Sequence, residues 1–349
     1  MLPSGTYAES YGQDKGLMRT KTQLGWLIFL FVLLGVLPLI IPAAWVTFFC
    51  LMFIYLIAVL GLQIVTGYCG QVNLGQAAFM GVGGLIGCAV AMKSNLPFEA
   101  ALIIGGLAAA TYGLIFALPA VRVKGFYLCL TTIAAQFIFL FIMTHIPEEF
   151  FGGEFGAVRV EKITTAWGMT ITSDAGRYYV IMITLVILTL VAVNITRSRL
   201  GRAFMAVRDN EVAAEVMGIN ITYYKFLAFA ISSFYAGIAG VLLGYYMSWC
   251  AYEQFTLWHS IWMVGMLIVG GMGSISGAIF GTAILRLLQE GANVLGPQLM
   301  GAMGAHVAYP LMSLAIGVAV ILVLIYQPRG LSHGLRRLMT HFRLWPFPY

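Results

Sequence analysis

Residues that could do chemistry gather in one polar segment between apolar stretches. Residues 201–218 read GRAFMAVRDNEVAAEVMG, and both signs of charge alternate along them. Four apolar residues recur there at the spacing of one helical face, namely Phe204, Val207, Ala214 and Met217. We therefore expect one short amphipathic helix that ends at Gly218. A helix in lipid headgroups is usually basic on its polar face, so the alternating charge favours docking of a protein partner over a headgroup helix or a solvated loop.

Uncharged polar residues inside apolar stretches form a second candidate group. Asn, Gln and Thr side chains offer donors and acceptors where an unpaired polar group is costly. Such residues are candidates for lining a translocation pathway, first Gln71, Asn73 and Gln76, then Thr131, Thr132 and Gln136. The alternative is hydrogen bonding between helices, worth roughly 1 kcal/mol for each bond.

Signatures of enzymes and ATPases are missing from the sequence. None of the six lysines follows a glycine, so the phosphate-binding Gly-Lys-Ser/Thr loop is absent, and neither H-E-x-x-H nor G-x-S-x-G occurs. Apolar stretches hold almost no acidic residue of the kind that ion-coupled carriers keep in the membrane, and Arg286 and Glu290 are most simply a surface pair. The five cysteines show no paired spacing, so we expect neither disulfides nor a metal site. We expect no catalytic residue, cofactor or enzyme activity in this chain.

Composition excludes a soluble protein. Hydrophobic residues make up 61% of the 349 and charged residues 9%, with a mean hydropathy of +0.92, whereas soluble domains carry about a quarter charged residues. About 20 apolar residues, at 1.5 Å each, cross the roughly 30 Å hydrocarbon layer. That length predicts an all-α polytopic membrane protein of about ten transmembrane helices (range about 8–10). The candidate spans are 24–41, 45–65, 73–92, 98–118, 125–145, 178–196, 226–247, 257–272, 275–289 and 307–326.

Basic residues indicate the orientation. With a cytoplasmic N-terminus, 14 basic residues fall on cytoplasmic segments and 4 on external ones, the bias typical of membrane proteins. Both termini are then cytoplasmic, and this topology explains the net charge of +6 without a nucleic-acid partner. The expected divisions are a cytoplasmic N-terminal segment (1–23), a transmembrane domain (24–326) with a cytoplasmic loop (197–224) and an external loop (146–177), and a cytoplasmic tail (327–349).

Glycines predict breaks and close contacts in the helices. Gly67-x-x-Gly70 and Gly270-x-x-Gly273 each end one apolar stretch and open another, as broken helices of transporters do. Small residues at every fourth position predict grooves where helices approach closely, for static packing or for a moving interface. These sets are Gly83/Gly87, Gly105/Ala109/Gly113, Ala236/Gly240/Gly244 and Gly273/Gly277/Gly281.

Four stretches, in this order along the chain, resemble the permease subunits of branched-chain amino-acid ABC importers. They are Gly70 to Gly83, Arg122 to Thr131, Arg208 to Gly218, and Val269 to Gly277. The resemblance implies that the cytoplasmic loop receives an ATPase and that its coupling residues are Arg208, Asp209, Glu211, Ala213, Ala214 and Gly218. It also implies that ATP is bound by partner subunits.

The same resemblance implies a set of partners and a location. They are a second homologous permease subunit, two ABC ATPase subunits and an external solute-binding protein, in the lipid bilayer of a bacterial plasma (inner) membrane. The binding protein is expected to dock on the external loop, at Gly152, Gly153, Glu154 and Gly156.

Two departures from the family pattern leave the substrate open. Phe151 replaces a threonine that often opens the external glycine motif, and Gly84-Leu85 replaces an Ala-Tyr pair. The expected cargo is a branched-chain or related amino acid. Permeases for urea, short amides or other amino acids are the alternatives within the family, and an ion-coupled secondary carrier is the alternative outside it.

Overall fold

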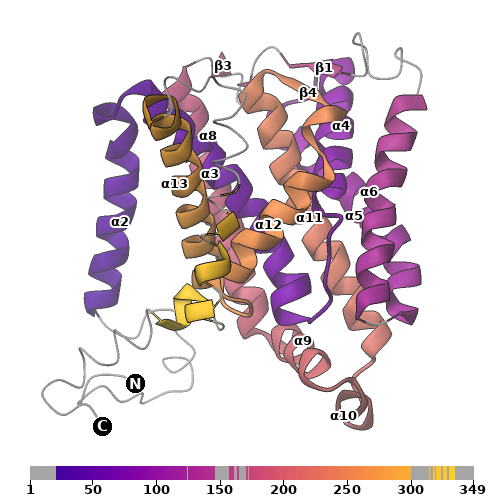
Figure 1. The fold of residues 1–349 in the computed structure, drawn as a ribbon. Helices are drawn as coiled ribbons and strands as arrows, with labels where there is room; N and C mark the ends of the chain where they lie inside the picture. The colour runs from indigo at the N-terminus through magenta and orange to yellow at the C-terminus, as the bar shows by residue number, and fades with distance from the viewer. Residues whose placement is uncertain are drawn as a thin grey trace, which may run out of the picture.

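Helices form nearly all of the described structure (Figure 1). The computed structural model describes residues 21–123, 125–145, 157–160, 163–164, 170–171, 173–299, 314, 317–318, 320–323, 325–327 and 330–334. The α-helices are α2 (Lys21–Ile40), α3 (Ala43–Leu62), α4 (Gln76–Ser94), α5 (Phe98–Arg122), α6 (Phe126–His145), α8 (Asp174–Arg197), α9 (Arg199–Asp209), α10 (Glu211–Val216), α11 (Ile221–Met247), α12 (Leu257–Gly270) and α13 (Ile275–Leu299). A π-helical turn, η1 (Gln63–Tyr68), extends α3, and a 3₁₀ turn, η3 (Tyr252–Gln254), precedes α12.

The predicted spans agree closely with these helices. Each of the first nine coincides with a helix, while most of the tenth, 307–326, lies outside the described residues. Among the described residues, six helices are long and apolar enough to cross a membrane, and α12 with α13 makes a candidate seventh span bent by 118° at its break. The chain is therefore a multi-pass helical membrane protein. A total of ten spans and cytoplasmic termini stay predictions.

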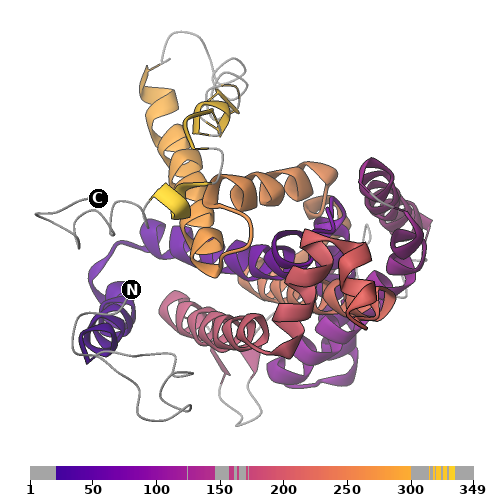
Figure 2. The ribbon, with the colours of Figure 1, turned by 90° about the horizontal axis from the view of Figure 1, so that it is seen from below.

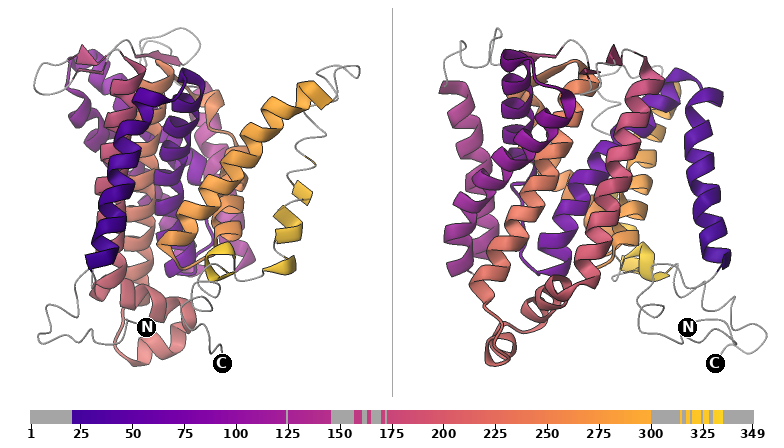
Figure 3. Two further views of the ribbon diagram at one scale, coloured as in Figure 1. Left: turned by 90° about the vertical axis from the view of Figure 1, so that its left-hand side faces the viewer. Right: turned by 180° about the vertical axis from the view of Figure 1, so that it is seen from behind.

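The core of the bundle is the group α4, α5 and α11, with α3 packed against α11. Viewed along the bundle, α2, α6 and α13 lie on the outside (Figure 2). From the side, α13 leans away from the other helices (Figure 3). Glycines permit the close packing, because a Cβ at Gly83 would meet the Cα of Gly237 and the carbonyl oxygen of Gly105. The predicted small-residue sets on α4, α5 and α11 thus face one another.

Two short antiparallel ladders were not predicted from the sequence. β1 (Ala157–Arg159) pairs with β4 (Trp249–Ala251), and β2 (Ile163–Thr164) pairs with β3 (Thr170–Ile171). Strands of two or three residues are too short to show an alternating pattern. They lie at the end of the bundle opposite α9 and α10 (Figure 1), so the described residues of 157–171 and the helices α9 and α10 are at opposite ends. The predicted docking residues Gly152, Gly153, Glu154 and Gly156 lie outside the described residues.

We expect Gly83→Ala to lower the midpoint of thermal unfolding of the detergent-solubilised protein. The added methyl group meets backbone atoms of two neighbouring helices, which cannot move aside as a side chain can. Overpacking of this kind costs about 1–3 kcal/mol. Gly35→Ala is the matched control, because nothing lies within 4 Å of a Cβ built at Gly35. Equal midpoints for the two variants would refute the close contact of α4, α5 and α11.

Candidate functional site

The polar segment folds as two helices rather than the single helix that was predicted. Asn210 interrupts it with an extended backbone (φ −161°, ψ 111°), so that α9 ends at Asp209 and α10 starts at Glu211. The Asn210 side-chain oxygen accepts a hydrogen bond from the Ala213 N–H at 3.1 Å and caps α10. Asparagine is among the preferred residues at this position, so the break was visible in the sequence.

The change of direction at Asn210 also moves Met217 to another face. Phe204, Val207 and Ala214 are buried as predicted. Met217 is 80% exposed, because α10 points away from the bundle, and Val212 and Val216 of α10 are exposed with it. Gly218 has a φ of +80°, a conformation that favours glycine, and follows the end of α10. α10 therefore presents an unpartnered apolar surface beyond the bundle.

A buried ion pair fixes the base of α10. The Lys225 ammonium at the start of α11 lies 2.6 Å from a carboxylate oxygen of Glu211, and the Lys225 side chain is 1% exposed. A buried charge is costly unless it is paired, so each group requires the other. Lys225 was counted in the sequence only as a topology signal, and its role as the partner of Glu211 was missed.

Arg208 links α9 to the two predicted helix breaks. Its side-chain carbons pack on Gly70, which has a φ of +73°. Its Nη1 donates a hydrogen bond to the Gly67 carbonyl oxygen at 3.1 Å, and a Cβ on Gly273 would lie 2.8 Å from the same nitrogen. Nη2 also pairs with the Asp209 carboxylate at 2.9 Å. One arginine thus contacts both glycine motifs.

The two breaks lie against each other and form what we call the glycine joint, namely η1 with Gly70 and the turn Gly270–Ser274. The Gln63 amide nitrogen donates to the carbonyl oxygens of Gly271 at 3.3 Å and Ser274 at 2.9 Å. Gly67 packs directly on Gly273. Broken helices free backbone groups that must be satisfied inside a membrane protein, and Gln63 and Arg208 supply those partners.

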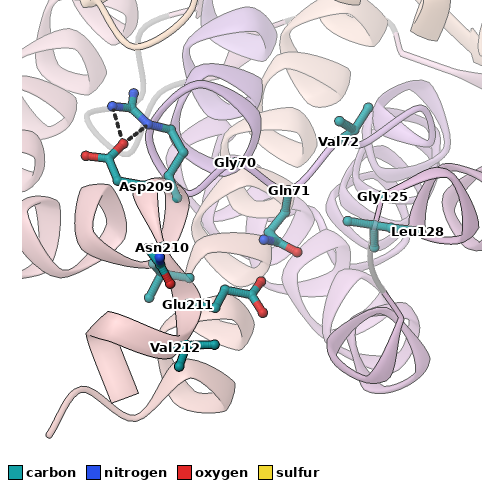
Figure 4. Close-up of a pocket in the computed structure, with 11 residues that line it drawn as sticks. Gly70, Gln71, Val72, Gly125, Leu128, Asp209, Asn210, Glu211 and Val212 are labelled. Carbon is teal, nitrogen blue, oxygen red and sulfur yellow. Dashed lines mark hydrogen bonds and ion pairs between the residues drawn. The ribbon is translucent and has the colours of Figure 1, made fainter. Parts of the chain in front are cut away.

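A cleft of about 320 Å³ opens beside the glycine joint. Its lining residues come from the segment after η1, the start of α6 and the α9–α10 junction, and they are Gly70, Gln71, Val72, Gly125, Leu128, Val207, Arg208, Asp209, Asn210, Glu211 and Val212. In Figure 4 the side chains of Gln71 and Glu211 point toward the same space. The cleft thus joins one predicted pathway residue to the predicted coupling residues, although these groups are far apart in sequence.

Asn73 and Gln76 belong to a buried network that connects helices. The Asn73 amide donates to the Gln76 side-chain oxygen at 2.9 Å. Gln76 donates in turn to the Ala58 carbonyl oxygen of α3 at 2.9 Å, and the Ser232 hydroxyl of α11 donates to Gln76 at 3.2 Å. In this conformation these two predicted pathway residues hold α3, α4 and α11 together.

Of the second group of predicted pathway residues, two make contacts with other segments and one bonds within its own helix. The Thr132 hydroxyl accepts the Leu74 N–H at 3.0 Å, and Gln136 donates to the Phe255 carbonyl oxygen at 2.6 Å. Thr131 bonds only within its own helix, to the Tyr127 carbonyl oxygen at 3.0 Å. Ser260 of α12, missed in the sequence, joins Gln136 to α4, because its hydroxyl accepts the Ala77 N–H at 2.8 Å and lies 3.4 Å from the Gln136 oxygen. A lone serine in an apolar stretch gives little signal.

Known proteins resemble the chain over most of its length. Residues 44–326 match the family model described as the permease component of branched-chain amino acid transport systems. The chain is 28% identical over 335 residues to the high-affinity branched-chain amino acid transport system permease protein LivM of Escherichia coli K12, covering 89% of this chain and 75% of that protein. It is 33% identical over 139 residues to the high-affinity branched-chain amino acid transport system permease protein BraD of Pseudomonas aeruginosa, covering 39% of this chain and 41% of that protein. No solved structure matches the chain.

Glu211→Gln should destabilise the α9–α10 junction. The variant leaves the Lys225 ammonium buried without a carboxylate, and breaking a buried pair costs about 3–5 kcal/mol. We expect a lower thermal midpoint in detergent, largely restored in the double variant Glu211→Gln/Lys225→Met, which removes the unpaired charge. Glu215→Gln on the exposed side of α10 is the control. A stable single variant would contradict the buried pair.

Cys69, which follows η1, should react slowly with alkylating agents. Burial raises the pKa of its thiol to about 12, an effect that the Lys225 ammonium opposes and the Glu211 carboxylate reinforces. The thiolate is the reactive form, so below that pKa the thiol is protonated and alkylation is slow. We expect the rate of N-ethylmaleimide labelling to rise with pH throughout the range that the protein tolerates. A variant with the other four cysteines replaced by alanine isolates the signal, and a plateau just above pH 9 would contradict it.

Proposed function

Because this chain belongs to the family of permease components of branched-chain amino-acid transport systems, we propose that it imports branched-chain or closely related amino acids as one membrane-spanning subunit of an ATP-driven transporter. A second homologous permease subunit supplies the other half of the pathway. Two ABC ATPase subunits bind α9 and α10 from the cytoplasm, and an external solute-binding protein delivers the amino acid at the β1–β4 end.

The exposed apolar surface of α10 carries this proposal. Val212, Val216 and Met217 lie on a helix that projects from the bundle, while the adjoining Glu211 is held by Lys225. A rigidly anchored helix with an apolar tip suits a partner that must push on the bundle. In this account the push passes through Arg208 to the glycine joint, where two broken helices meet.

One departure from the family pattern has a packing explanation. A Cβ on Gly84 would lie 2.9 Å from the Gly240 carbonyl oxygen and 3.2 Å from the Cys250 sulfur, so this position faces α11 and β4. The residue pair Gly84-Leu85 therefore gives no reason to prefer urea or short amides over amino acids as the cargo.

Reconstitution into liposomes tests the proposal. With the second permease, the ATPase subunits and the binding protein present, ATP should drive accumulation of L-[¹⁴C]leucine but not of [¹⁴C]urea. The chain alone should accumulate neither, with or without an ion gradient. Uptake by the chain alone under an ion gradient would identify a secondary carrier, and preferential uptake of urea would reject the amino acid.

Val216→Asp and Met217→Asp should prevent the ATPase subunits from co-purifying with the permease. Both side chains are about four-fifths exposed, so the substitutions should leave the thermal midpoint unchanged. Burying a carboxylate in an apolar contact is costly, which is why binding should fail. Met217→Leu keeps the apolar character and is the matched control. Normal association of the ATPases with both aspartate variants would reject α10 as the docking helix.

A further inference from the structure

A buried arginine lies where α13 packs against α3 and α12, and the sites above do not explain it. Arg286 is 8% exposed, which corrects the expectation of a surface pair with Glu290. It follows Ile275, the first residue of α13, by 11 positions. At 1.5 Å per residue this places it about 16 Å along the helix from the glycine joint.

The surroundings of Arg286 are aromatic and polar, and the Glu290 carboxylate, one helical turn further along α13, attracts its charge without forming an ion pair within 4 Å. Its guanidinium carbon lies 5.3 Å from the ring centroid of Tyr55, and Nη1 donates to the Gln289 side-chain oxygen at 2.8 Å. The Tyr55 ring stacks on His259 with centroids 6.4 Å apart. With the residues that the structure describes, Arg286 forms no ion pair within 4 Å, and its Nε has no hydrogen-bond partner.

The unpaired charge needs a physical reason. A charged side chain buried in a membrane protein is costly unless it is paired. The cation–π contact with Tyr55 offsets only part of this cost. The buried Thr282 hydroxyl, one turn before Arg286 on α13, also lacks a partner among the described residues. The Nε–H of Arg286 and the Thr282 hydroxyl can each donate a hydrogen bond that no described residue accepts. Together these two donors form a site for an anion.

The helices that pack on α13 also carry the buried polar network. Ala58, which accepts the hydrogen bond from Gln76, is three residues after Tyr55 on α3. Ser260, which contacts Gln136, directly follows His259 on α12. The same two helices therefore carry the network and the aromatic residues around Arg286. An anion at Arg286 would therefore lie against the two helices that also hold this network.

We propose that Arg286 binds the carboxylate of the transported amino acid during its passage through the membrane, an inference that rests on the proposed function. Guanidinium donates two parallel hydrogen bonds to a carboxylate, and the unpartnered Nε–H lies on an edge suited to this geometry. Thr282 is the additional donor. Tyr55 and His259 form an aromatic wall that holds the guanidinium in place when the ligand is absent.

The test compares an acid with its amide. The complete transporter in nanodiscs, without the binding protein, is assayed for binding of L-[¹⁴C]leucine and for competition by L-leucinamide, which keeps the shape and lacks the carboxylate. We expect wild type to bind leucine at least tenfold more tightly than leucinamide. Arg286→Gln should abolish this preference and Arg286→Lys should retain part of it. Arg159→Gln, which removes an exposed arginine of β1, should behave as wild type.

Two results would overturn the proposal. One is an Arg286→Gln variant with the wild-type thermal midpoint that still prefers leucine tenfold, which would reduce Arg286 to a structural residue. The other is equal binding of leucine and leucinamide by wild type, which needs no variant and therefore holds if Arg286→Gln fails to fold. Either result with intact ATP-driven leucine uptake rejects the carboxylate site alone. Absence of that uptake in the complete transporter rejects the proposed function itself.

Discussion

The contact of Arg208 with the glycine joint is the connection on which the rest of the structure depends. A helix that breaks inside a membrane protein exposes backbone groups, which must be satisfied by protein when water is excluded. Gln63 and Arg208 supply those partners for two breaks that are about two hundred residues apart in sequence. Because Arg208 belongs to α9, the helix outside the bundle is in direct contact with both breaks, and the ion pair of Lys225 with Glu211 holds α10 to α11.

Polar side chains inside the bundle also need hydrogen-bond partners, and the described residues supply these partners for some side chains but not for all. The side chains of Asn73, Gln76 and Gln136 make hydrogen bonds inside the bundle, and these bonds hold neighbouring segments together in this conformation. Arg286 is the contrasting case, because its charge is buried beside Tyr55 with an unpartnered Nε among the described residues.

The sequence predicted the helices well and the contacts between them less well. Apolar length and glycine positions sufficed to locate the first nine helices, since lipid constrains length and polarity so strongly. The spacing of apolar residues could not show which face Met217 occupies, because Asn210 separates α9 from α10 and changes the direction of the chain. Pairs such as Glu211 with Lys225, or Arg286 with Tyr55, depend on three-dimensional packing. Arg286 was interpreted as a surface residue because i, i+4 spacing gives the helix neighbour but not the depth of burial.

The ratio of solute moved to ATP hydrolysed in liposomes containing the complete transporter tests the central claim most directly. In Arg208→Ala the ATPase subunits should still bind and hydrolyse ATP, since α10 and its ion pair with α11 are intact. The number of leucine molecules accumulated per ATP should fall at least fivefold, because the motion of α9 no longer reaches the glycine joint. A ratio equal to that of wild type would contradict the account.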